Sequence, residues 1–368
     1  MTTNKDLSLY FHIPFCVKKC EYCAFYSLPR AGEEIKALYF DAIKKQISFL
    51  PRERRIISVY FGGGTPPVLG VNRLCKLVES VVSGFRLSDN CEITVEINPG
   101  TAGAEELKSL RAAGFNRISL GIQSADDAVL TRLGRIHDYA AAEKCVAYAR
   151  AAGFDNLSAD VMFALPGQTA EGFLISLEKI VSLGPDHISA YSLQLEEETP
   201  FYSKRDLLDF PEEDVEEAQY GSLCGYLKSK GYEHYEVSSF AKPGFKARHN
   251  SVYWDMGEYF GLGAAAHSFF NGKRFYSPPD VNAYIKKAQE GLFAPTNYEE
   301  ALVAGEDDMA EERLMLGLRT SAGATVPTLK KDAAERIARL GYGTFDGERL
   351  ILNDKGFRVS NAIIAKLI

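Results

Sequence analysis

The sequence has no long hydrophobic run. No stretch in its 368 residues approaches the roughly 20 consecutive apolar residues that a bilayer-spanning helix needs, so no transmembrane segment is predicted. The first residues, MTTNKDLSLYFHIPF, also lack the basic segment, apolar segment and small-residue cleavage site of a secretory signal. We therefore expect a cytoplasmic protein.

An excess of positive charge is also missing. The chain has 42 Lys and Arg against 49 Asp and Glu, a formal net charge of −7. Binding of DNA or RNA depends on neutralising phosphates with cationic side chains, so nucleic acid is not expected as a partner. With 46% hydrophobic and 25% charged residues, the chain has ample apolar material for a folded core, which excludes a disordered protein.

Cysteine is scarce and unevenly placed. There are seven, an odd number that does not suggest a framework of disulfide pairs. Three of them, Cys16, Cys20 and Cys23, fall within eight residues. The other four stand alone in apolar or amphipathic stretches, where we expect buried and chemically idle thiols: Cys75, Cys91, Cys145 and Cys224.

The first 230 residues repeat one pattern: a short apolar or β-branched run, a few polar or glycine residues, and a segment with helical periodicity. Strands that alternate with helices favour a parallel sheet with helices packed outside it. Amphipathic helices are predicted between the strands, for example at 33–50, 71–85 and 104–114. The six predicted strands are 7–13, 56–62, 92–98, 117–123, 157–163 and 187–193.

Chemically distinctive residues gather at the carboxyl ends of these strands. The three cysteines follow the first strand, GGGTPP follows the second, and Glu96, Gln123 and Asp160 lie in or after the next three. A barrel collects its active site from successive strand ends around one mouth, whereas a doubly wound sheet concentrates its ligand contacts at one switch point. We therefore predict an α/β fold, a partial (β/α)6 barrel similar to an incomplete TIM barrel.

Three domains are predicted. Residues 1–230 would form the partial barrel, which ends with an acidic helix at 211–232. Residues 231–295 are rich in aromatics and glycine and would form a subdomain of short strands and loops. A charged segment at 297–318 marks the start of a C-terminal α+β or helical domain, residues 296–368, whose tail is similar to a winged helix.

The motif CVKKCEYC places the three clustered thiols on a loop after the first strand. Three ligands are one fewer than a closed zinc or iron–sulfur site requires. One hypothesis is a 4Fe–4S cluster in which the protein holds three irons and the fourth is open to a small molecule. The alternatives are a structural zinc with His12 as fourth ligand, or three incidental thiols. Zinc sites usually combine two ligand pairs, and no second pair lies nearby.

This cysteine spacing resembles the radical S-adenosylmethionine (SAM) superfamily, in which the open iron binds the methionine part of SAM. One electron from the cluster then cleaves SAM to a 5′-deoxyadenosyl radical. FGGGTP (61–66) is similar to the superfamily's GGE element, with Thr65 in place of Glu. Further motifs resemble the oxygen-independent coproporphyrinogen III oxidases and their relatives: TVEINPG (94–100), RISLGIQS (117–124), LGRIH (133–137), LPGQT (165–169), YEVSSFAKPG (235–244) and HNSVYW (249–254).

The resemblance implies a SAM site around the three cysteines. Carboxylates such as Glu96 and Asp160 suit ribose hydroxyls or an ammonium, and Arg135 suits a carboxylate. Taken singly, each could instead form a hydrogen bond at the mouth of the barrel or a surface ion pair. The residues implied to line the site are Tyr10, Tyr22, Gly63, Gly64, Thr65, Glu96, Gln123, Arg135 and Asp160.

Within this group the sequence is more similar to the HemW-like haem chaperones than to the oxidases. The oxidases carry a fourth cysteine where Phe25 stands here, and a longer segment before the cluster than the fifteen residues that precede Cys16. HNSVYW matches a motif that the chaperones use for haem: His249 offers an axial imidazole, and the aromatic residues after it offer flat surface to a porphyrin. His267 is a second candidate ligand. For both histidines the alternative is a packed structural residue.

The resemblance implies a protein that holds a 4Fe–4S cluster and SAM and passes haem to acceptor haemoproteins. The alternatives are an oxygen-independent coproporphyrinogen III oxidase and a radical methyltransferase or cyclase that acts on another tetrapyrrole. An electron donor such as a flavodoxin or ferredoxin is implied, and a homodimer and a peripheral membrane contact are compatible with the resemblance. The sequence leaves open whether SAM is cleaved, and therefore whether the protein is an enzyme.

Overall fold

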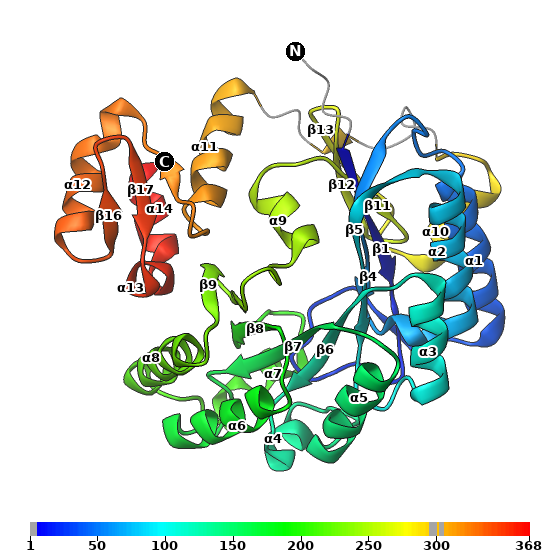
Figure 1. Ribbon diagram of the computed structural model, residues 1–368, viewed down its shortest axis with the longest axis horizontal. Coiled ribbons are helices and arrows are strands. Elements are labelled where there is room, and N and C mark those ends of the chain that lie inside the picture. Colours follow the sequence, from blue (N-terminus) through cyan, green and yellow to red (C-terminus); the bar gives the residue numbers. More distant parts are fainter. Residues whose placement is uncertain (1–5, 294–299, 302–304) are drawn as a thin grey trace.

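The computed structural model describes residues 6–293, 300–301 and 305–368. Within these residues, its main feature is a twelve-stranded sheet in the order β14-β13-β12-β11-β1-β4-β5-β6-β7-β8-β10-β9. The sheet is curved, with helices on its outer side (Figure 1). Its central strands run parallel from β1 to β8: β1 (Asp6–Ile13), β4 (Arg55–Gly63), β5 (Arg86–Ile97), β6 (Arg117–Gln123), β7 (Asn156–Phe163) and β8 (His187–Ser192).

All six predicted strands are confirmed to within one residue at each end, with one exception. Strand β5 begins at Arg86 and not at residue 92. Its first residues, RLSDN, are mostly polar and carry no strand periodicity, but Arg86 and Leu87 pair with Arg55 and Ile56 at the start of β4, and the register then shifts between Ile56 and Ser58. Backbone pairing with a neighbour therefore extends this strand where its side chains give no signal.

The helices between the strands are amphipathic and pack on the outer face of the sheet. In α2, the buried residues Val71, Leu74, Leu77, Val78 and Val81 recur three and four apart, which places them on one face. The predicted partial barrel is therefore confirmed. The covering helices are α1 (Glu33–Ile47), α2 (Val71–Gly84), α3 (Ala104–Ala113), α4 (Asp127–Arg132), α5 (Tyr139–Ala151), α6 (Ala170–Ser182) and α8 (Glu213–Ser229).

The two faces of the central strands differ in polarity. Leu9, Phe11 and Val95, for example, belong to the main apolar core together with the buried residues of the helices. The alternate residues Tyr10, Tyr60 and others point to the opposite, inner face, because successive side chains of a strand alternate. This inner face carries an unusual number of buried polar groups: Ser8, Ser58, Thr94, Arg117, Ser119, Ser158, His187 and Ser189. The polar interior of the barrel is therefore where a ligand site is to be sought.

Residues after the barrel extend both edges of the same sheet. At one edge, β11 (Tyr259–Leu262) lies parallel to β1 and is followed by the antiparallel strands β12 (His267–Phe270), β13 (Lys273–Tyr276) and β14 (Glu300–Ala301). At the other edge, β10 (Ser239–Ala241) is antiparallel to β8 and to β9 (Glu233–Glu236). The aromatic and glycine-rich tract thus contributes strands to the sheet of the barrel.

The HNSVYW motif corrects one expectation. It lies in a helix, α9 (Arg248–Trp254), where the sequence predicted short strands and loops. The two carboxylate oxygens of the buried Glu92 accept hydrogen bonds from the backbone amides of Arg248 and His249, at 3.1 and 3.0 Å. These amides begin a helix and have no partner within it, so a carboxylate from β5 stabilises this start.

The C-terminal part of the chain has its own small core. Helix α11 (Glu306–Gly317) precedes it, and a three-stranded antiparallel sheet in the order β15-β17-β16 lies against three further helices. The predicted boundary at residue 296 lies outside the described residues. The elements are β15 (Ala324–Thr325), α12 (Lys331–Arg339), β16 (Gly343–Phe345), β17 (Arg349–Leu352), α13 (Asp354–Arg358) and α14 (Ser360–Leu367).

The remaining described elements are short. α10 (Val281–Gln289) packs against α1, and α7 (Pro200–Ser203) follows β8. β2 (Phe15–Cys16) pairs with β3 (Leu28–Pro29). Three single turns of 3₁₀-helix lie at 66–69, 205–207 and 328–330. None of the helices in the described part of the chain combines the length and apolar character required to span a bilayer.

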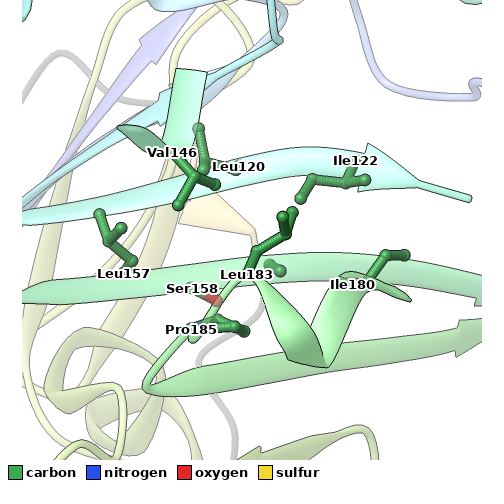
Figure 2. Close-up of a pocket in the computed structure, with 9 residues that line it drawn as sticks. Leu120, Ile122, Val146, Leu157, Ser158, Ile180, Leu183 and Pro185 are labelled. Carbon is green, nitrogen blue, oxygen red and sulfur yellow. The ribbon is translucent and has the colours of Figure 1, made fainter. Parts of the chain in front are cut away.

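A small pocket lies between the sheet and its outer helices (Figure 2). Leu120, Ile122, Leu157 and Ile180 are among its lining residues, and Ser158 is the one lining residue with a polar side chain. A pocket without converging polar groups offers nothing to orient a reactive ligand. It is part of the helix–sheet core and carries no candidate site.

Candidate functional site

The three clustered cysteines lie on a loop at the carboxyl end of β1. Cys16 ends the short strand β2, and the amide of Cys23 donates to the carbonyl of Cys20 in a turn, at 3.3 Å. The loop is fixed at both ends, because Arg30 N donates to Cys16 O at 3.0 Å and Leu28 N donates to Pro14 O at 2.6 Å. All three thiols are partly exposed and none forms a disulfide. They are therefore accessible at the open end of the barrel.

The glycine triplet at the end of β4 brings that strand against the cysteine loop. Gly64 N donates to Ile13 O at 2.9 Å, and Thr65 N donates to Phe15 O at 2.8 Å. A Cβ atom on Gly64 would lie 2.9 Å from Sγ of Cys16, and one on Gly63 would lie 2.6 Å from the ring of His12. Gly63 also has φ +109°, which disfavours any other residue. These glycines therefore allow the end of β4 to approach the cysteine loop closely.

Thr65 and Asn98 connect the glycine segment to the next strand. Thr65 Oγ1 lies 3.7 Å from Cys16 Sγ, toward which it donates, and it accepts from Asn98 Nδ2 at 2.8 Å. Sequence reasoning missed Asn98 as a site residue, although it belongs to the TVEINPG motif. The sequence feature that could have identified it is its position: Asn98 directly follows β5 and lies two residues after Glu96.

Arg135, which follows α4, contacts both the cysteine loop and Asn98. Its Nη1 lies 3.6 Å from Sγ of Cys20, and its Nη2 donates to Asn98 Oδ1 at 2.5 Å and to Gly121 O at 2.6 Å. Its Nε is buried and has no hydrogen-bond partner among the described residues. The guanidinium therefore retains a donor for an anionic ligand. Tyr22 lies beside it and packs against Val129 and Leu133.

Two partly buried carboxyl groups lie on the inner side of the strands β5 and β7. Glu96 accepts from Tyr60 Oη at 2.7 Å and from Gly63 N at 3.1 Å, and burial raises its pKa to about 7. Asp160 accepts from Ser119 Oγ at 3.2 Å, and burial raises its pKa to about 6, opposed by the charge of Arg117. Buried carboxyls with raised pKa values are common at ligand sites, because burial costs the ionised form its hydration.

Gln123 ends β6 at the same edge, and its backbone has φ +68°. A residue other than glycine rarely adopts this conformation, and such residues concentrate at binding sites where the surroundings enforce them. Its amide nitrogen would lie 3.2 Å from a Cβ atom on Gly121, which also adjoins Arg135. The structure thus brings Gln123 and Arg135 together.

His249 lies deeper in the barrel and is almost fully buried. Ser58 Oγ lies 2.9 Å from its Nδ1 and Tyr253 Oη lies 2.8 Å from its Nε2, so both ring nitrogens are hydrogen-bonded. Burial lowers its pKa to about 3, so the imidazole is neutral. Its ring stacks on Tyr60 at 5.1 Å between centroids, and the ring of Tyr10 lies 6.2 Å from that of Tyr60 and 6.3 Å from that of His249. Tyr10 therefore lies beside this histidine.

The other two histidines considered from the sequence lie apart from one another. His12 Nδ1 is 3.0 Å from Tyr10 Oη and its Nε2 is 3.0 Å from Tyr26 O, so a zinc site with His12 would have to break one of these bonds. His267 is exposed on β12 and stacks on Tyr276 of β13 at 5.3 Å between centroids.

Comparisons with known proteins agree with this arrangement. A family model described as the radical SAM superfamily matches residues 10–180. The heme chaperone HemW of Lactococcus lactis subsp. lactis is 36% identical, covering 99% of this chain and 98% of the relative, and that of Bacillus subtilis is 34% identical, covering 95% and 92%. A mitochondrial radical S-adenosyl methionine domain-containing protein 1 of Mus musculus is 34% identical, covering 86% and 74%.

One solved structure matches almost the whole chain. Coproporphyrinogen III oxidase (HemN) from Escherichia coli superposes with a TM-score of 0.85, covering 98% of this chain and 89% of that one. The two sequences are 22% identical, so this likeness establishes the fold and not the reaction.

Proposed function

Because the chain belongs to the HemW family within the radical SAM superfamily, we propose that it is a haem chaperone, which binds haem and transfers it to acceptor haemoproteins. The observation that carries this proposal is full-length similarity to proteins named heme chaperone HemW, at 30–36% identity over 95–99% of the chain in four of them. The cysteine loop supports it, because Phe25 stands in the place of the oxidases' fourth cysteine.

Cys16, Cys20 and Cys23 would hold a 4Fe–4S cluster. The donor set fits, because three accessible thiols share one loop, and Thr65 and Arg135 direct an O–H and an N–H toward the sulfurs of Cys16 and Cys20. Such donors stabilise anionic sulfur. A bound cluster with one iron free of protein ligands would supply an electron and a coordination position for SAM.

The residues around the cluster loop would bind SAM. Arg135 would pair its free Nε with the carboxylate of the methionine part, and the backbone of Gly63 and Gly64 would approach it closely because no Cβ intervenes. Glu96 and Asp160 would accept hydrogen bonds from ribose hydroxyls or the ammonium. The SAM contacts proposed are Tyr10, Tyr22, Gly63, Gly64, Thr65, Glu96, Gln123, Arg135 and Asp160.

Haem is the cargo in this proposal, and His249 is its proposed ligand. In the structure His249 is a buried, neutral imidazole whose nitrogens are bonded to Ser58 and Tyr253. It can ligate iron only after the bond at one nitrogen is broken and α9 has moved. His267 needs no such change, because it is exposed. The proposal therefore includes a rearrangement of α9 on haem binding, and His267 is the ligand if α9 stays in place.

An anaerobic titration of the reconstituted protein with haem tests the proposal, with the Soret absorbance as readout. Gel filtration with an apo haemoprotein then follows haem from one protein to the other and reports the oligomeric state. We expect saturable binding and transfer. Absence of both would refute the proposed function.

The second candidate is an oxygen-independent coproporphyrinogen III oxidase, and the fold shared with HemN favours it. In that reaction a hydrogen atom is abstracted from each of two propionate side chains, the carboxyl group of each leaves as carbon dioxide, one further electron from each passes to an electron acceptor, and two vinyl groups remain. The protein would be incubated anaerobically with SAM, a reductant or a flavodoxin or ferredoxin, and coproporphyrinogen III. Turnover to protoporphyrinogen would replace the chaperone assignment.

A further inference from the structure

A second group of metal-type ligands lies away from the cysteine loop, where the edge of the sheet meets the C-terminal core. Cys224 lies on α8, His234 on β9 and Asp354 at the start of α13. One ligand atom of each residue lies within 4.8 Å of those of the other two, and the described residues contain no other such trio of Cys, His, Asp or Glu. Residues 130 positions apart in the chain thus converge on one point.

The histidine of this trio is held in a fixed orientation. Its ring stacks on Phe240 at 4.0 Å between centroids and meets the edge of Phe357 at 4.8 Å. His234 Nδ1 lies 2.8 Å from Asp354 Oδ1, while its Nε2 is buried without a hydrogen-bond partner among the described residues. A buried polar nitrogen without a partner is uncommon and requires an explanation.

The thiol of the trio, on Cys224, lies beside a buried phenol. Cys224 is buried, and Tyr220 lies one turn earlier on α8. The Oη of Tyr220 is buried beside the thiol; it has no nitrogen or oxygen partner in the described part of the chain and interacts with the thiol itself. Asp354 is half exposed, so an ion could reach the trio from solvent on that side. The trio therefore contains one buried nitrogen without a partner and is open to solvent on one side.

Nucleophilic catalysis and a purely structural hydrogen bond both fit these residues less well than metal binding does. A Cys, His and Asp set can serve nucleophilic catalysis, but that requires a thiol that a substrate can reach, and Cys224 is buried with burial raising its pKa. A plain His–Asp hydrogen bond beside an inert thiol would leave the buried Nε2 of His234 without a partner.

We propose that Cys224, His234 and Asp354 bind a divalent cation of the zinc type, which fastens α13 of the C-terminal core to α8 and β9 of the barrel. Thiolate, imidazole and carboxylate are the three ligand types that proteins use for zinc, and a water completes four-coordination. Ligand atoms around zinc lie roughly 3 to 4 Å apart, so a small inward shift of the three side chains is required. Binding displaces the proton of the thiol.

The location gives this cation a structural role. The same junction is held by Arg358, which pairs with Glu213 at 3.7 Å and with Glu217 at 3.3 Å, and by backbone bonds from Ser321 N to Tyr235 O at 2.9 Å and from Val237 N to Arg319 O at 2.8 Å. The ion pairs are largely exposed on the glutamate side and contribute little. A metal bridge would be the strongest link between the C-terminal core and the sheet.

The test is an anaerobic titration with Zn²⁺ against a chromophoric chelator, repeated with Co²⁺ to detect the thiolate-to-metal charge-transfer band. The chain with its cluster reconstituted is compared with a variant in which Cys16, Cys20 and Cys23 are all serine. We expect one Zn²⁺ per chain beyond the cluster iron in the first and one retained in the second. Loss of Zn²⁺ binding in the serine variant would place the ion on the cysteine loop and overturn the proposal.

Three substitutions complete the test. Asp354→Asn, at a half-exposed position, should weaken Zn²⁺ binding at least tenfold, and Cys224→Ser should remove the charge-transfer band. Cys145→Ser, at a buried thiol on α5, is the matched control and should retain both. Zn²⁺ should raise the unfolding temperature of the wild type and not that of Asp354→Asn, which keeps the proposal testable if Cys224→Ser fails to fold. Equal Zn²⁺ affinity in the wild type and Asp354→Asn would refute it.

Discussion

Arg135 Nη1 lies 3.6 Å from Sγ of Cys20, although 115 positions separate the two residues in the chain. The same guanidinium is fixed by Asn98 and by the carbonyl of Gly121, so the cysteine loop, β5 and β6 are joined through one side chain. Because Arg has several donors in a rigid plane, it can contact a thiolate and a carboxylate at once. Lysine cannot.

Arg135→Lys should therefore separate cluster binding from SAM binding. Iron and sulfide content should stay at the wild-type level, while SAM affinity should fall by ten- to a hundredfold, the effect of losing a charged hydrogen bond of about 1.5 to 3 kcal/mol. Equilibrium dialysis of the reconstituted protein measures this. Arg132→Lys, one turn earlier on the same segment and bonded to Pro166 O, is the control and should bind SAM normally.

Cys20→Ala should abolish the cluster. The remaining two thiols of the loop cannot retain four irons, so the absorbance of the cluster and the binding of SAM should both be lost. Cys75→Ala, at a partly exposed cysteine on α2, should leave iron content unchanged. An intact cluster in Cys20→Ala would remove the three-cysteine assignment.

Gly64→Ala should disturb the cysteine loop through steric conflict alone. The added Cβ would lie 2.9 Å from both Cys16 Sγ and Phe15 O, closer than side-chain atoms normally come. We expect a loss of stability of about 1 to 3 kcal/mol and reduced iron content, measured by denaturant unfolding and iron assay. Gly221→Ala is the matched control: it lies in α8 with open space around it, so alanine should be neutral or stabilising by up to about 1 kcal/mol.

The burial of Glu96 predicts a pH dependence of SAM binding. The pKa of Glu96 is about 7 in the folded protein, against an ordinary value of 4.5, so Glu96 is protonated below about pH 7 and cannot pair with an ammonium. SAM affinity should fall by up to tenfold for each pH unit below about 7. Glu96→Gln should remove this dependence, and an unchanged profile in that variant would assign it to another group.

The same shift has the opposite effect on the stability of the ligand-free protein. A folded-state pKa that is raised means that the folded protein binds the proton more tightly than the unfolded chain does. The stabilisation from Glu96 is therefore fully present below pH 4.5 and is lost as the pH rises through about 7. Denaturant unfolding of the wild type and Glu96→Gln at several pH values should show this difference.

His249→Ala and His267→Ala distinguish the two haem ligands. If α9 rearranges, His249→Ala should weaken haem binding and shift the Soret band while the cluster remains intact. His267→Ala should then have little effect. The reverse outcome would show that haem binds the exposed histidine and that α9 stays in place.

The sequence predicted the barrel and the cysteine loop because both depend on local patterns. The apolar residues of β1 and β4 recur in runs that a parallel sheet buries, and the spacing of the three ligands can be read directly from CVKKCEYC. Other features depend on contacts between distant segments. No local pattern indicates that Glu92 would cap α9 from 156 positions away, or that Asn98 would join Thr65 to Arg135.

Contacts between distant segments also decide how the isolated cysteines are interpreted. Cys91, Cys145 and Cys224 are buried, as expected of idle thiols. Both Cys145 and Cys224 belong to the main apolar core, so burial does not show that Cys224 also lies close to His234 and Asp354. Those neighbours come from β9 and α13, so only the folded chain reveals them.

The carboxylate of Glu92 has a consequence for how HNSVYW could change its position. Its two oxygens hold the first two amides of α9, and α9 is the segment that keeps His249 turned into the barrel. An outward movement of α9 would break both of these hydrogen bonds and leave the buried oxygens of Glu92 without their partners. Glu92 would therefore oppose such a movement, although it lies on β5 and outside the motif itself.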